Sequence, residues 1–332
     1  MDRQRDLIST IHDQFQKISN VLVVSHVRPD GDAIGSLLGV GLALLETGKD
    51  VQMVISDGVP DNFRFLVGSE LVTKKPTGKI DYIIVVDSSD IERTDEILQE
   101  YGIPDLNIDH HKTNTRFAKI NLIENEAVAT AEILARYLPF WGLKITKPIA
   151  DALLTGIITD TIGFRTTNII PQTLKLTADL MELGGDLTGI YHKTIIEQSY
   201  AAARYWGAGL SKLQMENGLV WTTLSLSERN TSGYPYRDDA DLIKILSAIE
   251  GAKIAVILTE QTRGYVKISW RLCGSLQTDW DVSEIAQKFG GGGHKAAAGA
   301  DVKGKLDEVV LEVLNITRIS MNQQKEPIEE IR

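Results

Sequence analysis

The chain has 332 residues, of which 43% are hydrophobic and 24% charged, so it is long enough for one large globular domain or two smaller ones. Its formal net charge of −10 argues against non-specific binding of long duplexes, because that affinity depends on many basic contacts with phosphates. No apolar run reaches the roughly 18 residues that a membrane-spanning helix needs. The single Cys273 permits no intrachain disulfide. We therefore expect a cytoplasmic protein that does not enter a membrane, and the sequence leaves a monomer and a homodimer open.

The first half of the chain alternates between apolar, β-rich runs and helical patterns. An amphipathic helix is predicted within residues 1–20. Strands are then predicted at 21–25, 51–56, 80–86 and 105–108, with helices at 33–47 and 91–101. Strands that are almost wholly apolar and separated by helices are typical of a parallel sheet covered on both faces. The pattern predicts a Rossmann-like α/β domain that binds ligands beyond the carboxyl ends of its strands.

Helical patterns dominate residues 126–216, and from Gly218 onward strand-like runs appear. Three strands, expected to be antiparallel, are predicted at 219–226, 253–260 and 264–271, with helices at 240–249, 282–288 and 305–319. We therefore expect a smaller second α/β domain. The predicted organisation is a first domain at 1–185, a helical linker at 186–200, the second domain at 201–325 and a polar tail at 326–332.

Acidic and histidine side chains stand at or near the ends of the apolar runs in the first half. They are His26, Asp30, Asp32, Asp87, Asp109, His110, His111 and Asp160. Taken singly, Asp32 could be a helix N-cap and Asp87 a turn residue. Because the sheet edge would bring the segments together, a site for divalent cations explains them jointly. Two cations held close together can perform phosphoryl chemistry.

The second half carries a glycine run, Gly290–Gly293, followed by His294 and Lys295. Glycines let backbone N–H groups approach a phosphate closely, although such a run can equally be a flexible loop. The alternating strand at 265–271 places Lys267, Ser269 and Arg271 on one face, which could bind a ligand or simply face solvent. Arg165, five residues after Asp160, is either a phosphate contact or an exposed side chain.

The ordered set His26-x3-Asp30-x-Asp32, Asp87, Asp109-His110-His111 and Asp160 resembles the DHH family of phosphoesterases over roughly residues 20–170. The segment Gly291–Gly299 resembles the signature of the DHHA1 domain, the substrate-binding partner of many DHH proteins. Members often have Arg-Ser where this chain has Arg271-Leu272, which is a departure from the family pattern.

The resemblance implies two divalent cations, usually Mn²⁺, with Mg²⁺ and Co²⁺ as alternatives. His26, Asp30 and Asp87 would hold one ion, and Asp32, Asp87, His110 and Asp160 would hold the other, with Asp87 as the bridge. His111 would stand beside the scissile phosphate as a hydrogen-bond donor or acid, and Asp109 would orient its neighbours. The resemblance implies substrate contacts at Arg271, Ser269 and His294. The residues themselves add Gly292, Gly293 and Arg165 as candidate contacts.

Compact DHH–DHHA1 proteins of this length hydrolyse short oligoribonucleotides and 3′-phosphoadenosine 5′-phosphate, and the resemblance implies this activity, which yields AMP and phosphate from the latter. Short single-stranded RNA or small nucleotides would be the partners. A cyclic-dinucleotide or linear-dinucleotide phosphodiesterase is the alternative enzyme. An alternative of another class is a catalytically silent nucleotide-sensing module, against which the intact ligand residues at every motif argue.

Overall fold

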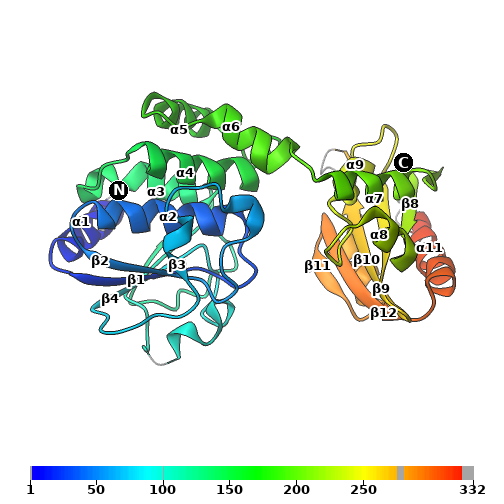
Figure 1. The fold of residues 1–332 in the computed structure, drawn as a ribbon, viewed down its shortest axis with the longest axis horizontal. Coiled ribbons are helices and arrows are strands. Elements are labelled where there is room, and N and C mark those ends of the chain that lie inside the picture. Colours follow the sequence, from blue (N-terminus) through cyan, green and yellow to red (C-terminus); the bar gives the residue numbers. More distant parts are fainter. Residues whose placement is uncertain (1, 100, 275–279, 324–332) are drawn as a thin grey trace, which may run out of the picture. The chain divides into compact units, whose positions relative to one another are not determined.

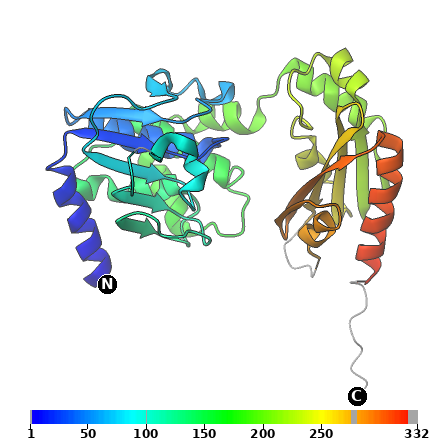
Figure 2. The same cartoon turned by 90° about the horizontal axis from the view of Figure 1, so that it is seen from below.

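The computed structural model describes residues 2–99, 101–274 and 280–323. The chain divides into two compact units, Met1–Glu197 and Gln198–Arg332, shown in Figures 1 and 2. The predicted linker at 186–200 spans the end of the first unit and the start of the second. The predicted tail at 326–332 and the last two residues of the predicted second domain lie outside the described residues. No helix in the described part of the chain is long and apolar enough to cross a membrane.

The first unit contains a parallel sheet with the strand order β3-β2-β1-β4-β5-β6. Its strands are β1 (Asn20–Val24), β2 (Asp50–Val54), β3 (Val72–Thr73), β4 (Tyr82–Val86), β5 (Leu106–Asp109) and β6 (Ile120–Ile123). This is the strand order of a Rossmann sheet. The strands β2 and β3 lie on one side of β1 and the strands β4, β5 and β6 on the other, so the switch point lies between β1 and β4. The predicted Rossmann-like α/β fold is therefore confirmed, although the short strands β3 and β6 were not predicted.

One face of this sheet is buried beneath a layer of helices that forms the main core (Figure 1). The helices of the unit are α1 (Asp2–Phe15), α2 (Gly31–Leu45), α3 (Thr130–Tyr137), α4 (Lys147–Asp160), α5 (Pro171–Glu182) and α6 (Leu187–Tyr191). Short helical turns connect them: η1 (Asp61–Phe63), η2 (Ser69–Leu71), η4 (Pro139–Trp141) and the π-helix η5 (His192–Ile196).

The opposite face of the sheet carries a smaller core cluster that includes Ile97 and Leu98. These residues belong to η3 (Glu92–Leu98), a 3₁₀ segment. The prediction of a regular helix at 91–101 was wrong, because Asp95 has a φ of 59° and interrupts the helical backbone. The second face is therefore covered by a short 3₁₀ segment instead of a long helix.

Glycines allow α2, α3 and α4 to approach one another closely. A Cβ atom on Gly35 would lie 2.3 Å from the backbone oxygen of Ala152 in α4. A Cβ atom on Gly156 would lie 2.5 Å from the Cβ of Ala131 and 2.6 Å from Oδ1 of Asp32. Distances this short exclude a side chain, so Gly156 lets Asp32 stand against α3 and α4.

Gly156→Ala should therefore destabilise the fold by about 1–3 kcal/mol through overpacking. It should also weaken binding of a divalent cation at the predicted site, because Asp32 must move. The control is Gly207→Ala in α7 (Tyr200–Leu210), where a new Cβ meets nothing within 4 Å and helix propensity favours alanine. Denaturant unfolding and Mn²⁺ titration measure both effects. If Gly156→Ala left stability and Mn²⁺ affinity at wild-type values, the close approach would not hold.

The second unit contains a mixed sheet with the order β11-β12-β10-β9-β8-β7. The strands are β7 (Gln214–Glu216), β8 (Leu219–Leu224), β9 (Ile254–Thr262), β10 (Tyr265–Leu272), β11 (Gly292–His294) and β12 (Ala297–Lys303). The expectation that the strands at 219–226 and 253–260 are antiparallel was wrong, because β8 and β9 pair in parallel. The chain crosses from one to the other through α8 (Leu226–Ser232) and α9 (Leu242–Leu246), and parallel neighbours require such a crossover.

Helices cover one face of the second sheet fully and the other in part. Trp270 and Val256 point into a core shared with α10 (Val282–Gln287) and α11 (Leu306–Gln323), and α11, drawn in red, lies along the sheet in Figure 2. On the opposite face, Ala255 and Ile257 of β9 are buried beneath α7 and α9. The β10-β12-β11 part of that face is not covered by this core, and its side chains are more exposed.

Candidate active site

The structure brings the six predicted metal ligands together at the carboxyl edge of the first sheet, beside the switch point between β1 and β4. They come from the loop after β1, the start of α2, the ends of β4 and β5 and the last residue of α4: His26, Asp30, Asp32, Asp87, His110 and Asp160. Ligand atoms of His26, Asp30 and Asp87 lie within 4.8 Å of one another, and so do those of Asp32, His110 and Asp160. A third group, Asp87, His110 and His111, overlaps these two, so the geometry contains three overlapping groups of possible ligands.

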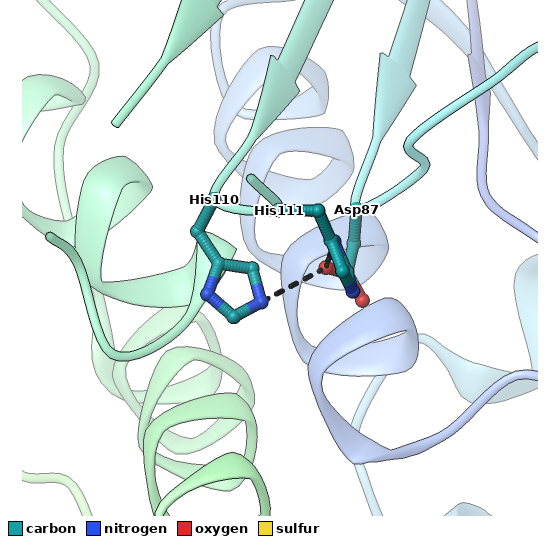
Figure 3. A group of neighbouring side chains, drawn as sticks. All are labelled: Asp87, His110 and His111. Carbon is teal, nitrogen blue, oxygen red and sulfur yellow. Dashed lines mark ion pairs between the residues drawn. The ribbon is translucent and has the colours of Figure 1, made fainter. Parts of the chain in front are cut away.

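Asp87 lies between these two groups. Its Oδ2 is 3.6 Å from Nε2 of His26, and its Oδ1 is 3.8 Å from Nε2 of His110. Figure 3 shows both His110 and His111 directed toward this carboxylate. Thr130, which was not predicted, donates a hydrogen bond from its Oγ1 to Oδ1 of Asp87 at 3.0 Å. One buried carboxylate therefore offers its two oxygens in two directions, as a bridging ligand does.

The backbone fixes the protonation of two histidines. Nδ1 of His26 is 2.8 Å from the carbonyl oxygen of Val27, and Nδ1 of His110 is 3.3 Å from that of Ala127. A carbonyl oxygen only accepts hydrogen bonds, so each Nδ1 carries the proton. Each ring therefore turns its Nε2 toward the carboxylates, and a bound metal would take the place of a proton on that atom.

The two aspartates at the start of α2 cap different helices. Asp30 is the N-cap of α2, because its Oδ1 accepts hydrogen bonds from the backbone nitrogens of Asp32 and Ala33 at 3.1 and 3.0 Å. Asp32 instead accepts from the backbone nitrogens of Thr130 and Ala131, at 2.6 and 2.9 Å, and so caps α3. The N-cap considered for Asp32 on its own helix therefore belongs to Asp30.

Burial and neighbouring charges shift the pKa values of the carboxyl groups in the cluster. Burial, together with the charges of Asp87 and Asp160, holds the pKa of Asp32 well above its usual range. Burial likewise raises the pKa of Asp160 to about 6. Burial alone would also raise the pKa of Asp87, but the hydrogen bond with His26 and the neighbouring histidines lower it to about 2. Divalent cations would neutralise this concentration of negative charge, and the mixture of carboxylate and imidazole suits Mn²⁺, Mg²⁺ or Co²⁺.

His111 is held by a buried neighbour. The Nδ1 of His111 donates to Oδ1 of Asp109 at 2.7 Å and lies 3.8 Å from Oδ1 of Asp87. Asp109 is fully buried, and its Oδ2 accepts a hydrogen bond from Nδ2 of Asn114 at 2.6 Å. The hydrogen bond to Asp109 raises the pKa of His111 to about 8. Asn114 was missed, and its only signal in the sequence is a polar side chain shortly after the Asp-His-His run.

Arg165 lies on a turn directly after α4. Ile162, Gly163 and Phe164 have consecutive positive φ values of 52°, 69° and 64°, which are unfavourable for branched or bulky side chains. The backbone nitrogen of Arg165 donates to the carbonyl of Thr161 at 2.8 Å. Within the described residues, the exposed Arg165 guanidinium makes no ion pair. Arg165 therefore follows Asp160 closely in the sequence, but no ion pair joins it to the cluster in the described part of the chain.

The predicted substrate contacts of the second unit align across three strands. Arg271 of β10 pairs with Ala297 of β12, which pairs with His294 of β11. The next row on the same face contains the three residues Ser269, Gly299 and Gly292. Gly293 pairs instead with Ala298, in the row that points to the opposite face. The flexible-loop alternative for the glycine run is wrong for Gly292–His294, which form the edge strand β11.

This arrangement leaves an open surface in which small residues separate the larger polar side chains. Arg271 and His294 are exposed, and Ser269 is half-buried. Ala297 and Gly299 between them add little side-chain bulk, and a Cβ on Gly292 would meet nothing within 4 Å. We call this surface, made by Arg271, Ser269, His294, Ala297 and Gly299, the Arg271 face. Its guanidinium and imidazole groups can donate hydrogen bonds to an anion.

The Rossmann-like sheet with a carboxylate–histidine cluster at its switch point, together with the family matches, shows that this chain is a metal-dependent phosphoesterase. Residues 20–157 match the DHH family, N-terminal domain, and residues 235–317 match the DHHA1 domain. The chain belongs to the DHH family.

Known relatives agree with this assignment. The bifunctional oligoribonuclease and PAP phosphatase NrnA of Thermus thermophilus is 34% identical over 304 residues, covering 90% of this chain and 89% of that protein. A crystal structure of an exopolyphosphatase-related protein from Bacteroides fragilis superposes with a TM-score of 0.84 at 25% identity, covering 96% of each chain. RecJ of Thermus thermophilus in complex with Mn²⁺, at 13% identity and a TM-score of 0.55, shares the fold, and the alignment covers 98% of this chain and 56% of RecJ.

Proposed function

We propose that this protein hydrolyses the phosphoester bonds of short oligoribonucleotides, as an exonuclease, and converts 3′-phosphoadenosine 5′-phosphate to AMP and phosphate. The observation that carries this proposal is the placement of Asp87, whose two carboxylate oxygens face His26 and His110 in different directions. The similarity to an oligoribonuclease and PAP phosphatase over most of the chain supports the choice of substrates. The single buried Cys273 is consistent with action in the cytoplasm.

The two ligand groups have distinct roles in the proposal. His26, Asp30 and Asp87 would hold one divalent cation, and Asp32, His110 and Asp160 would hold the second, with Asp87 shared. Mn²⁺ is the preferred ion in the proposal, with Mg²⁺ and Co²⁺ as alternatives. Such a pair, when bound, supplies an activated water and neutralises charge on the phosphoryl oxygens.

His111 would act from the substrate side. Its Nδ1 is occupied by Asp109, so its Nε2 is the atom that can reach a substrate. Because the pKa of His111 is raised to about 8, the ring is largely protonated at neutral pH and can give a proton to the leaving oxygen. Asp109 would keep the ring oriented and positively charged, while Asn114 holds Asp109.

The Arg271 face would bind the rest of the nucleotide. Arg271 and His294 lie in one cross-strand row and would bind a substrate phosphate, with Ser269 and the backbone at Gly292 and Gly293 as further contacts. The Ala297 and Gly299 floor would admit a flat base or sugar close to the sheet. Arg165 is proposed as an additional phosphate contact from the first unit.

A panel of three substrates with Mn²⁺ tests the proposal: 3′-phosphoadenosine 5′-phosphate, a 5′-labelled diribonucleotide and a cyclic dinucleotide. Arg271→Ala should raise KM for the first two by about 10- to 100-fold, which is the scale of a lost charge-assisted hydrogen bond. Arg263→Ala, an exposed arginine in the turn before the same strand, is the matched control and should behave as wild type.

Each outcome of the panel has a distinct meaning. Cleavage of the first two substrates, with KM raised in Arg271→Ala and unchanged in Arg263→Ala, supports the proposal. Cleavage of only the cyclic dinucleotide would point to a phosphodiesterase of that type. If the Mn²⁺-loaded protein bound nucleotides but cut none of the three, a nucleotide-sensing module would replace the proposed enzyme.

A further inference from the structure

Arg93 of η3 is held between the two loops that bear the histidines of the cluster. Its carbonyl oxygen accepts a hydrogen bond from the backbone nitrogen of Val27, next to His26, at 2.7 Å. Its own backbone nitrogen donates to Oδ1 of Asp90 at 3.0 Å. Arg93 therefore has a fixed backbone position beside the loop from His26 to Asp30.

The segment before Arg93 is also tied to the loop after His111. The carbonyl of Ser88 accepts a hydrogen bond from Nδ2 of Asn114 at 3.1 Å, and the carbonyl of Ser89 accepts one from the backbone nitrogen of Thr115 at 2.8 Å. Asn114 is the same residue that holds Asp109. These contacts place Arg93 beside both the loop that follows His26 and the loop that follows His111.

The guanidinium of Arg93 lacks a carboxylate partner among residues 2–99, 101–274 and 280–323. Arg93 is half-buried. Arg136, which is equally half-buried, shows the usual arrangement, because its guanidinium lies between the carboxylates of Glu124 and Glu132. A partly desolvated cation without an anion is costly, and a phosphate is the anion that a guanidinium fork matches best.

We propose that Arg93 binds a non-bridging oxygen of the phosphoryl group that is hydrolysed, on the side of that group that faces His111. The proposal rests on the function given above, and it adds a substrate-binding residue that the motifs of the sequence do not single out. Because the contact is to the reacting phosphate, it is shared by every substrate of the site. It also strengthens as charge develops on that oxygen, so its loss lowers kcat as well as kcat/KM.

Arg93→Ala tests the proposal on the Mn²⁺-loaded full-length protein. We expect kcat/KM to fall about 10- to 100-fold for both 3′-phosphoadenosine 5′-phosphate and a diribonucleotide. Arg93→Lys should recover only part of the loss, since lysine provides charge without the planar fork. Mn²⁺ binding and the thermal unfolding midpoint should stay at wild-type values. The control is Arg64→Ala, an exposed arginine of the same unit whose ion pair is with Asp61.

A loss confined to 3′-phosphoadenosine 5′-phosphate would overturn the proposal, because Arg93 would then read the second phosphate. A change of less than about threefold in both substrates, or a loss of Mn²⁺ binding, would also overturn it. If the wild-type protein cut neither substrate, the proposed function would fail separately. Calorimetric titration of inorganic phosphate into the Mn²⁺-loaded protein would then decide on Arg93: weaker binding in Arg93→Ala supports the contact, and unchanged binding contradicts it.

Discussion

Asp87→Asn is expected to lower kcat/KM for 3′-phosphoadenosine 5′-phosphate by about 10³-fold or more, because one side chain serves both proposed ions. Asparagine keeps the shape of the side chain and removes its charge, and its amide nitrogen cannot bind a cation. Binding of Mn²⁺, followed by calorimetry, should weaken at both sites and not at one alone. Steady-state assays at saturating Mn²⁺ and at several lower concentrations separate lost metal from lost chemistry.

Asp13→Asn is the matched control for this change. Asp13 is exposed on α1 and belongs to none of the groups of possible ligands, so the same chemical substitution should leave activity and Mn²⁺ binding intact. Circular dichroism should show that both variants are folded. Near-wild-type turnover by a folded Asp87→Asn protein would remove the bridging role and with it the two-ion site.

His111→Asn should reduce kcat by about 10²- to 10⁴-fold, the usual contribution of a positioned acid, while Mn²⁺ binding stays close to wild type. The distinction from Asp87 follows from the geometry, because the Nδ1 of His111 is used by Asp109 and the ring is half-buried. The matched control is His192→Asn, an exposed histidine of η5. Loss of Mn²⁺ in His111→Asn would instead make His111 a metal ligand.

The pH profile gives a second test of His111. Its folded pKa of about 8 means that the protonated ring predominates below about pH 8 and is lost above it, so kcat should fall on the alkaline side. The hydrogen bond to Asp109 is the main cause of this raised value. Asp109→Asn should therefore move the alkaline limb to lower pH. An alkaline limb that does not move in Asp109→Asn would show that another group controls it.

The position of the cluster could be predicted because the functional residues follow strands whose apolar runs are unmistakable. Asp87 directly follows the wholly buried strand β4, and the Asp-His-His run begins at the last residue of β5. Once such strands are assumed to be parallel, their carboxyl ends must meet at one edge. The fold class and the site edge therefore follow from local pattern and one topological rule.

Contacts between distant segments could not be predicted in this way. Thr130 contacts Asp87 across 43 residues, and Asp32 caps a helix 98 residues further along the chain. No local pattern marks either pairing, because both depend on the close approach of α2, α3 and α4. The position of Arg93 was missed for the same reason, since the segment from Ser88 to Arg93 is hydrogen-bonded to the loops after β1 and β5.

In the second unit, the strands β7, β11 and β12 were not predicted, and the expected direction of one strand pair was wrong. The strand β12 has the sequence Ala-Ala-Gly-Ala-Asp-Val-Lys, which is poor in β-branched and aromatic residues, and β11 is mostly glycine. Pairing with the alternating strand β10 stabilises both. The apolar runs at 219–226 and 253–260 did not by themselves fix the direction of these strands, so the parallel pairing of β8 and β9 needed the crossover helices to be recognised.

The most direct test of the two-ion site is a crystal grown with Mn²⁺ and measured at the manganese absorption edge. Two anomalous peaks about 3.5–4 Å apart are expected, one beside His26 and Asp30 and the other beside Asp32, His110 and Asp160, with Asp87 between them. A single peak at full Mn²⁺ saturation, or two peaks of which only one contacts Asp87, would contradict the bridged pair.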